Sequence, residues 1–490
     1  MADAEQFEAY MSDADALMWN VEKDPLLRST IVSVVQLDRS PSWERLVDRI
    51  ERGAYLIPRL RQRVVTPFLR LGPPHWSADP HFDITYHLRR VRAPEPATFD
   101  TVLDLARTVA MASFDRARPL WEFTLVEGLR DGGAALVLKV HHSMTDGVGG
   151  MRLAMMLYDL EREPGDPGPA GAVEELETHT PFGLVGPALE LQRDRALGMA
   201  RRALITALEL PRTVLRDPRR SLERAAIVGG SVARMLAPAL TPRSPIMTER
   251  TLARRLDTLE LPLDDLKRAA KAVGGTLNDA FVAAVVGGMR RYHDRHDRVP
   301  DDLRMTMPIN VRKEGGALGG NQFTPVRFLV PLSITDPAER ITALGTLARH
   351  ERDEPAVQMT DALATVLNQL PTSVTTALFG AMLKGADFVT SNVPGVPFPV
   401  YLAGAELRGN FAFGPLSGSA ANITLVSHCG TCCIGVNTDS VAIPDTDEFM
   451  ETLADGFAEI VALGGRAAEP SVTEPHDDDL APVGSGFTPT

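Results

Sequence analysis

Residues 139–150 read KVHHSMTDGVGG, which places two histidines, an aspartate and three glycines between two apolar runs. The run before them, residues 134–140, is apolar apart from one lysine, as is typical of a buried strand. The run after them, residues 151–160, has apolar side chains at 153, 156, 157 and 160, which is the spacing of an amphipathic helix. The sequence therefore predicts a strand, a turn that carries the histidines, and a helix.

The paired histidines indicate a general base. Consecutive side chains of an extended segment point to opposite faces, so only one of His141 and His142 can face a given cleft while the other packs. A neutral imidazole, with an ordinary pKa of about 6.5, can accept a proton at neutral pH and return it. Asp146 lies four residues beyond His142, where it either contacts the ring or holds the turn through an arginine. Three glycines permit a tight turn and leave room for a bulky substrate: Gly147, Gly149 and Gly150.

Two other kinds of site fit these residues less well. Zinc needs three or four converging ligands, whereas adjacent histidines in an extended segment diverge, so no metal is expected. The sequence has no G-x-S-x-G motif of a serine hydrolase. Residues 428–433, which hold one histidine and all three cysteines, are too crowded for a tetrahedral metal site and are interpreted as a buried strand.

Length and composition limit the class of protein. A chain of 490 residues exceeds the roughly 150 of one ordinary domain, so at least two domains are expected. The net charge of -13 argues against broad nucleic-acid binding. The acidic N-terminus lacks the pattern of a signal peptide, and no stretch approaches the roughly 18 uninterrupted apolar residues of a membrane-spanning helix. Because the cysteines are few and clustered, a cytoplasmic location is expected.

Two α/β blocks are predicted on either side of a basic connector. Residues 1–192 and 251–465 alternate strand-like and helical patterns and form the two predicted domains. The predicted connector, residues 193–250, holds eleven arginines against four acidic residues between Arg193 and Arg243. It is interpreted either as a solvated helical linker or as a surface that contacts anionic lipid headgroups. The last residues, 466–490, are rich in Pro, Asp and Gly and are expected to be disordered.

The motif HHxxxDG at residues 141–147 resembles the signature of the coenzyme A dependent acyltransferase superfamily. Within it, residues from about 11 to about 463 are similar to the bacterial wax ester synthase/diacylglycerol acyltransferase family. The segments that carry this resemblance are Pro119-Leu-Trp-Glu122, Asn278-Asp279, Pro308-Ile-Asn-Val-Arg312, Gly320-Asn321 and Ser391-Asn-Val-Pro-Gly395. The resemblance implies an α/β fold of two chloramphenicol-acetyltransferase-like domains, with the active site in the cleft between them.

The resemblance also implies roles for single residues. His142 would be the general base and His141 its support. Asp146 would be mainly architectural and paired with an arginine. Arg61 resembles the condensation-domain arginine that makes this pair, and other nearby arginines stay open as its partner. Asn278 would stabilise the oxyanion or line the site, although an Asn-Asp pair before an apolar helix is also a common helix start.

Two of the matching segments are interpreted as structural. Residues 119–122 are expected to pack as a clamp before a strand. In residues 391–395, proline and glycine are expected to set a turn. For both segments packing is favoured over substrate contact.

The function that the resemblance implies is O-acyl transfer. A long-chain fatty acyl group would move from acyl-CoA to diacylglycerol or a long-chain alcohol, which yields triacylglycerol or wax ester, with no cofactor besides the acyl-CoA co-substrate. Two alternatives stay open: a relative that uses a carrier-protein thioester or another acceptor, and a non-catalytic protein that binds lipid inclusions. Peripheral contact with the inner membrane or with lipid inclusions is a further expectation. The sequence leaves the acceptor, the chain length and the oligomeric state open.

Overall fold

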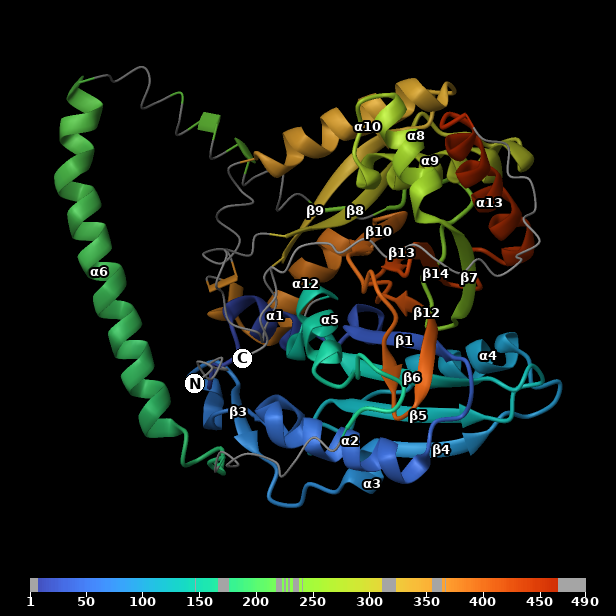
Figure 1. Ribbon diagram of the computed structural model, residues 1–490. Helices are drawn as coiled ribbons and strands as arrows, with labels where there is room; N and C mark the ends of the chain where they lie inside the picture. Colours follow the sequence, from blue (N-terminus) through green and yellow to red (C-terminus); the bar gives the residue numbers. More distant parts are fainter. Residues whose placement is uncertain are drawn as a thin grey trace, which may run out of the picture.

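Two six-stranded sheets form the centre of the molecule (Figure 1). The computed structural model describes residues 8–145, 147–165, 176–216, 241–310, 323–354 and 367–465, with scattered positions in 223–239 and 364–365. No single helix in these ranges is long and apolar enough to cross a membrane. Two helices joined by a sharp bend, residues 263–272 and 277–295, reach that length and apolar character only when they are taken together. The predicted disordered segment, residues 466–490, lies outside the described residues.

The first sheet has its helices on both faces. Its strands follow the order β11 (Tyr401–Leu402), β12 (Ala405–Phe413), β1 (Thr30–Leu37), β6 (Ala134–His141), β5 (Trp121–Glu127) and β4 (Leu88–Arg92). Apolar residues of α2 (Trp43–Leu56) pack on one face, and those of α4 (Phe99–Met111) pack on the other. The shorter elements around this sheet are α1 (Asp13–Val21), β2 (Gln62–Val65), β3 (His75–Ala78), α3 (Ile84–His87) and α5 (Gly147–Met155).

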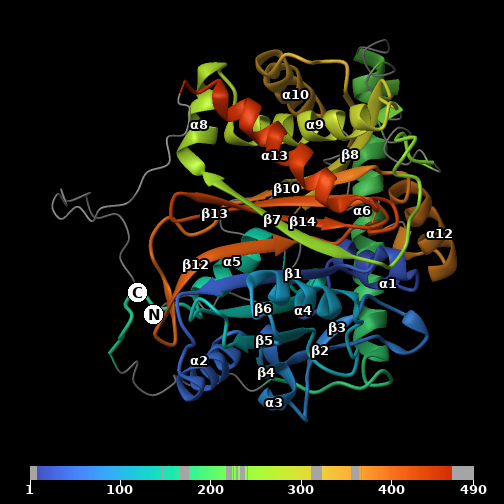
Figure 2. The same ribbon diagram turned by 90° about the vertical axis from the view of Figure 1, so that its right-hand side faces the viewer.

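Among the described elements, the helices that cover the second sheet lie on one of its faces (Figure 1). Its strands follow the order β7 (Arg255–Pro262), β14 (Thr431–Thr438), β13 (Ala421–His428), β10 (Phe388–Val393), β8 (Asp302–Asn310) and β9 (Phe323–Pro331). The covering helices are α8 (Leu263–Ala272), α9 (Leu277–Arg295), α10 (Pro337–Arg352) and α13 (Thr446–Ala462). The other face of this sheet is directed toward the first sheet, and α12 (Thr372–Leu383) packs beside α1 at the junction (Figure 2).

The two sheets do not follow the predicted division of the chain at residues 192 and 251. Strands β11 and β12 come from beyond residue 400, yet they join the first sheet beside β1. In this antiparallel pair Val32 lies opposite Phe413 and Val34 lies opposite Phe411. Both phenylalanines are fully buried against α4. The pairing of β12 with β1 therefore covers an otherwise open edge of β1 and buries two aromatic rings.

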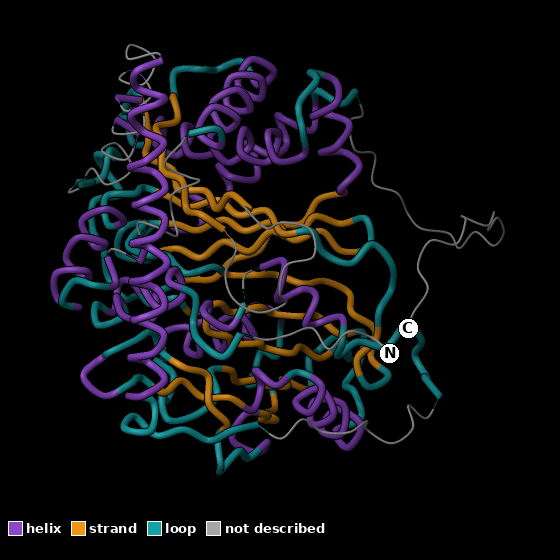
Figure 3. The backbone as a smooth tube through the Cα atoms, turned by 90° about the vertical axis from the view of Figure 1, so that its left-hand side faces the viewer, coloured by secondary structure: helices purple, strands orange, loops and turns teal. Residues whose placement is uncertain are grey.

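The helical part of the predicted connector begins earlier than residue 193. Helix α6 (Val185–Arg216) runs alongside both halves of the molecule (Figures 1 and 3). Leu189 and Leu197 on this helix are more than half exposed, whereas Arg195 pairs with Asp13 of α1 at 3.2 Å. Contact between this helix and lipid headgroups stays a prediction.

The cysteine-rich segment forms a hairpin between β13 and β14. Cys429 and Gly430 make its turn with positive φ angles of 44° and 81°, and Cys429 is exposed. Cys432 and Cys433 are buried in β14. The predicted buried strand is thus confirmed for residues 432–433, while a turn interrupts it at residues 429–430.

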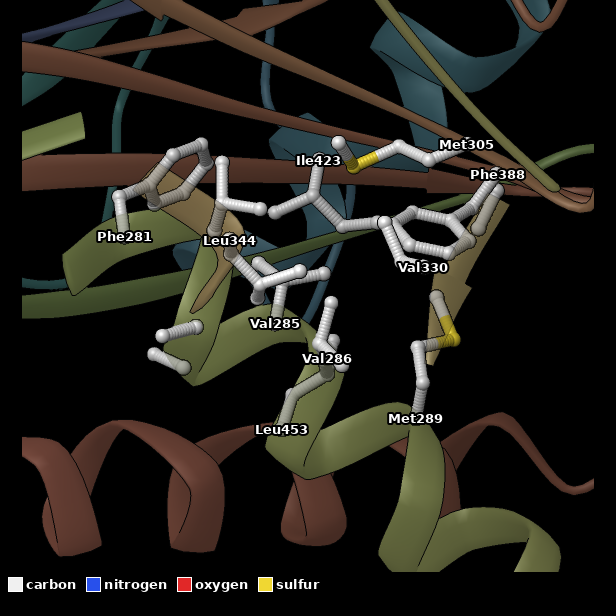
Figure 4. Packing of buried hydrophobic residues seen from close by; sticks show 14 of the residues in the cluster. Phe281, Val285, Val286, Met289, Met305, Val330, Leu344, Phe388, Ile423 and Leu453 are labelled. Carbon is white, nitrogen blue, oxygen red and sulfur yellow. The ribbon is translucent and has the colours of Figure 1, made fainter. Parts of the chain in front are cut away.

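Helix α9 is the centre of the second core. Its residues from Ala280 to Met289 are all buried, and Figure 4 shows it between the strands of the second sheet and α13. Thr276 caps this helix and exchanges hydrogen bonds with Asp279, the third helical residue. The reading of Asn278 as the capping residue is therefore wrong, because the helix starts one residue before it.

Because α9 and α13 are in close contact, we expect a single methyl group added between them to lower the stability of the protein. A Cβ atom at Gly456 would lie 2.6 Å from the Gly288 nitrogen and even nearer the Ala284 carbonyl oxygen. Gly456→Ala should therefore lower the unfolding free energy by about 1–3 kcal/mol, because the backbones must separate. A thermal melt followed by circular dichroism measures the loss. The matched control is Gly186→Ala on α6, where a Cβ would meet nothing within 4 Å; equal melting of both variants would contradict the prediction.

Candidate active site

The two histidines of the motif face opposite sides of the first sheet. Strand β6 ends at His141, and a short 3-10 turn, residues 142–144, continues the chain. His141 lines a hollow with Trp19, Glu22 and Arg116, whereas His142 lines a different cavity between the two sheets. The predicted division, in which one histidine packs and the other faces a cleft, is therefore seen in the structure.

His141 is held by a buried carboxylate. Its Nδ1 accepts the Ser143 N–H at 3.1 Å, so the hydrogen lies on Nε2, which donates to Glu22 Oε1 at 2.9 Å. Glu22 also accepts the Ser29 N–H at 2.7 Å and pairs with Arg116 at 3.1 Å. Burial alone would raise the pKa of Glu22, but the His141 ring, the Ser29 N–H and Arg116 together lower it. Glu22 is therefore an anion that fixes the tautomer and the orientation of His141.

No sequence pattern pointed to Glu22. It lies 119 residues before His141, at the C-cap of α1, in a stretch without a motif. An acidic residue among many others in an acidic chain carries no signal of its partner. Only the packing of α1 beside the end of β6 brings the carboxylate to the ring.

His142 lies at the wall of a large uncharged cavity. Its backbone N–H donates to the Ser29 carbonyl at 2.8 Å, which anchors the turn to β1. The cavity holds about 1300 Å³, part of it open to solvent. Residues such as Met18, Ile31 and Val389 make it largely apolar, and His142 is the one ionisable group among its described lining residues.

The three glycines of the motif differ in their surroundings. Gly147 lines the cavity, and a Cβ there would lie 2.7 Å from the Val393 side chain, so α5 begins tightly against β10. Gly149 is buried in α5, and a Cβ at Gly150 would lie 3.4 Å from Thr145. Of the three, only Gly147 is among the lining residues. Asp146 lies outside the described residues, so its pairing with Arg61 stays a prediction; Arg61 itself donates to the Ala54 carbonyl at 2.9 Å.

Asn278 lies on the helix side of the second sheet. Its Nδ2 is 3.6 Å from Met307 Sδ, and Met307 packs into the core beneath α9. The neighbours of Met307 in β8, Thr306 and Pro308, point the other way and line the cavity. The structure therefore does not bring Asn278 into the cavity wall beside His142. A role for Asn278 in the site stays a prediction, and from this position it would act through β8.

The opposite wall of the cavity comes from β8, β10 and β13. Ser391, Asn392 and Val393 line it, so the segment interpreted as a turn is strand up to Val393 and contributes directly to the cavity. Asn422 and Thr424 of β13 add further polar groups, and Thr424 Oγ1 donates to Asn422 Oδ1 at 2.9 Å. The sequence does not predict that these residues line the cavity, because the proline and the glycine after them indicate a turn.

The segment at residues 119–122 behaves as a structural element, whereas Pro308 of the segment at 308–312 lines the cavity. Leu120 and Trp121 are fully buried, and Trp121 Nε1 donates to the Leu60 carbonyl at 2.8 Å, which confirms the packing role of residues 119–122. Residues 311–322, which include Arg312 and the Gly320-Asn321 pair, lie outside the described residues.

The chain matches both profiles of one enzyme family. The wax ester synthase/diacylglycerol acyltransferase catalytic domain matches residues 11–281, and the C-terminal domain of the same family matches residues 319–461. A Mycobacterium tuberculosis (strain H37Rv) protein provisionally named a diacylglycerol O-acyltransferase is 38% identical over 469 residues, 94% of this chain and 93% of the relative. Another protein of that organism with the same provisional name is 30% identical over 480 residues, 94% of this chain and 98% of the relative.

Solved structures share the fold. A wax ester synthase/diacylglycerol acyltransferase from Marinobacter aquaeolei VT8 superposes with a TM-score of 0.61 at 21% identity, covering 93% of this chain and 100% of that one. The first condensation domain of the calcium-dependent antibiotic synthetase gives 0.58 at 16% identity, covering 94% and 97%. The predicted fold of two chloramphenicol-acetyltransferase-like domains is thereby confirmed. The family profiles and the 38% identical relative together show that this chain belongs to the wax ester synthase/diacylglycerol acyltransferase family and is an acyltransferase.

Proposed function

We propose that this enzyme transfers a long-chain fatty acyl group from acyl-CoA to diacylglycerol or a long-chain alcohol, with His142 as the general base. The observation that carries the proposal is the position of His142 at the wall of the uncharged, largely apolar cavity between the sheets. Such a cavity suits the chains of a fatty acyl donor and a lipid acceptor, because it buries them without desolvating an opposing charge. Location in the cytoplasm, at the inner membrane or at lipid inclusions stays a prediction.

The proposed chemistry is a single acyl transfer. Neutral His142 takes the proton of the acceptor hydroxyl while its oxygen attacks the thioester carbonyl carbon. The carbon–sulfur bond then breaks, the proton passes from His142 to the departing sulfur, and an ester and free coenzyme A are released. His141 and Glu22 do not contact the reacting atoms in this scheme, since they lie on the other face of the sheet, and they act as positioning residues.

The oxyanion of the tetrahedral intermediate needs a hydrogen-bond donor in the cavity. Asn392 and Ser391 line the wall opposite His142 and carry such donors. Asn278, the expected donor, has its amide beside Met307 instead. We therefore place Asn278 among the residues that position β8 rather than among those that contact the intermediate.

Removal of the His142 imidazole should abolish most of the activity while the fold persists. His142→Ala should lower kcat by at least about a hundredfold, within the roughly 10²- to 10⁴-fold range of general-base contributions. Coenzyme A release with a fatty acyl-CoA and an excess of acceptor measures it. The control is His350→Ala, which removes an exposed histidine on α10 and should leave kcat unchanged. Near-normal turnover of the His142 variant would remove it from the mechanism.

The choice of acceptor and donor is tested with the unmodified enzyme. Coenzyme A release should be seen with hexadecanol, with diolein or with both, because both present a hydroxyl on an apolar body that the cavity can bury. Acyl-carrier protein supplied in place of acyl-CoA should be the poorer donor. Turnover with the carrier alone would favour the carrier-thioester alternative. An absence of turnover with every pair would favour a non-catalytic lipid-binding protein.

Activity should fall on acidification because His142 becomes protonated. The fall is expected below about pH 6.5, and initial rates with saturating substrates measure it. Loss of the Glu22 contact does not cause this fall in activity. The pKa of Glu22 is lowered in the folded protein, so the contact stabilises the fold above the ordinary glutamate pKa of about 4.3. That stabilisation is lost only as the pH falls further. Circular dichroism at each pH should therefore show an intact fold. A rate that is constant down to about pH 5 would contradict the base assignment.

A further inference from the structure

A second, smaller pocket with two arginines lies next to the active-site cavity. We name it the cationic pocket; its defining residues are Arg28, Arg254 and Asn437, and mostly apolar residues, among them Met111 and Pro415, line the rest of it. Met111 ends α4 of the first half, whereas Arg254 directly precedes β7 of the second half. Helix α4 and strand β7 are in contact, so the pocket lies at the junction of the two halves. Pro415 lines both this pocket and the active-site cavity, which makes the two hollows neighbours.

Within the described residues, the hydrogen bonds of the two guanidinium groups go to backbone carbonyls. Arg28 Nη1 donates to the Met111 carbonyl at 3.0 Å, and Arg254 Nη1 donates to the carbonyls of Thr251 and Ala253 at 2.8 and 2.9 Å. Across the described ranges, no carboxylate lies within ion-pair distance of either guanidinium.

The two cations also repel each other. Burial is the main reason why the pKa of Arg254 is lowered; the charge of Asp439 opposes this, and the charge of Arg28 adds to the lowering. A pair of like charges at a partly buried site is costly unless an anion lies between them. Arginine forks match the oxygens of a phosphate, which can accept from both groups at once.

A third residue of the same pocket has a side-chain oxygen without a hydrogen-bond donor among the described residues. Asn437 is 5% exposed, and its Nδ2 donates to the Gly414 carbonyl at 2.9 Å. Its Oδ1 is buried and has no donor within the described part of the chain. A buried acceptor is normally satisfied, so this oxygen calls for an N–H or O–H from a bound molecule. The pocket thus offers two donors to an anion and one acceptor to a polar hydrogen.

The backbone connects this pocket closely to the catalytic histidine. Arg28 directly precedes Ser29, which lines the active-site cavity and whose carbonyl accepts the His142 N–H. On the other wall, Asn437 lies opposite Asn422 across the β13–β14 pair, and Asn422 Nδ2 holds the Pro415 carbonyl at 2.9 Å. A molecule anchored by an anionic group in the cationic pocket therefore lies beside the cavity where the acyl group reacts.

We propose that the cationic pocket binds the phosphate groups of the thioester donor, with Arg28 and Arg254 as phosphate ligands and Asn437 Oδ1 as the acceptor for an amide N–H or hydroxyl of its pantetheine arm. This inference rests on the proposed function, since it assigns the donor's polar end to a place next to the His142 cavity. Coenzyme A and a carrier-protein prosthetic group share this phosphopantetheine chemistry.

The test compares three palmitoyl thioesters at one fixed acceptor: those of coenzyme A, of 4′-phosphopantetheine and of pantetheine without phosphate. In Arg28→Gln, Arg254→Gln and the double variant, KM for palmitoyl-CoA should rise about tenfold or more, as expected for the loss of charge-assisted hydrogen bonds. The kcat/KM for palmitoyl-pantetheine should not change, because it has no phosphate to lose. Arg39→Gln, at an arginine exposed elsewhere on the surface, is the matched control and should change neither value.

The outcomes separate the possibilities. A loss shared by palmitoyl-4′-phosphopantetheine assigns the arginines to the pantetheine phosphate, and a loss confined to palmitoyl-CoA assigns them to the phosphates of its nucleotide; either supports the proposal. An equal loss with palmitoyl-pantetheine, or unchanged KM values throughout, overturns it.

Calorimetric binding of free coenzyme A keeps the two proposals distinguishable. Binding that weakens about tenfold or more in the double variant supports the pocket even if no acceptor is turned over, in which case only the proposed function fails. Coenzyme A binding that is equal in the wild type and the double variant overturns the pocket assignment, whatever the activity.

Discussion

The pairing of β1 with β12 is the contact on which the rest of the structure depends. Strand β1 has the histidine strand β6 on one side and β12, from the second half of the chain, on the other. One face of this pair is sealed by Phe411 and Phe413 against α4. The other face, with Ile31 and Ala412, forms part of the active-site cavity. A single strand therefore aligns the motif with the wall that the second half supplies.

The adjacent histidines, at the end of β6 and the start of the turn after it, face different hollows. His141 turns into the first half, where Glu22 and Ser143 are the hydrogen-bond partners of its two ring nitrogens. His142 turns to the opposite side, into a space without another ionisable group among its described lining residues. The Glu22 carboxylate on the His141 ring holds the turn in place, while the ring of His142, the proposed base, lies in apolar surroundings, which would strengthen its interactions with a developing charge.

The distribution of charge around His142 fits the proposed acyl-CoA donor, which has an apolar end and an anionic end. The cavity beside His142 is uncharged and suits acyl chains, whereas the neighbouring cationic pocket holds Arg28 and Arg254 without carboxylate partners in the described ranges. Asn422 and Asn437, paired across β13 and β14, hold the Gly414–Pro415 segment that separates the two hollows. An amphipathic thioester likewise has an apolar end, which would suit the cavity, and an anionic end, which would suit the cationic pocket.

The sequence by itself determined the strand before the motif, the opposed directions of His141 and His142, and the family, because these depend on local spacing and on a continuous motif. The helix predicted over residues 151–160 instead spans Gly147–Met155, and Met156 and Leu160 of its predicted apolar face are exposed, because the chain leaves the helix to pair Asp159 with Tyr401. Only the tertiary structure decided that β12 completes the first sheet, that Glu22 holds His141, and that Asn392 rather than Asn278 lines the cavity. These contacts join residues more than a hundred positions apart, and no periodic pattern in the sequence predicts them. They arise because two sheets must cover each other's open faces and edges, which brings together side chains that have no relation along the chain.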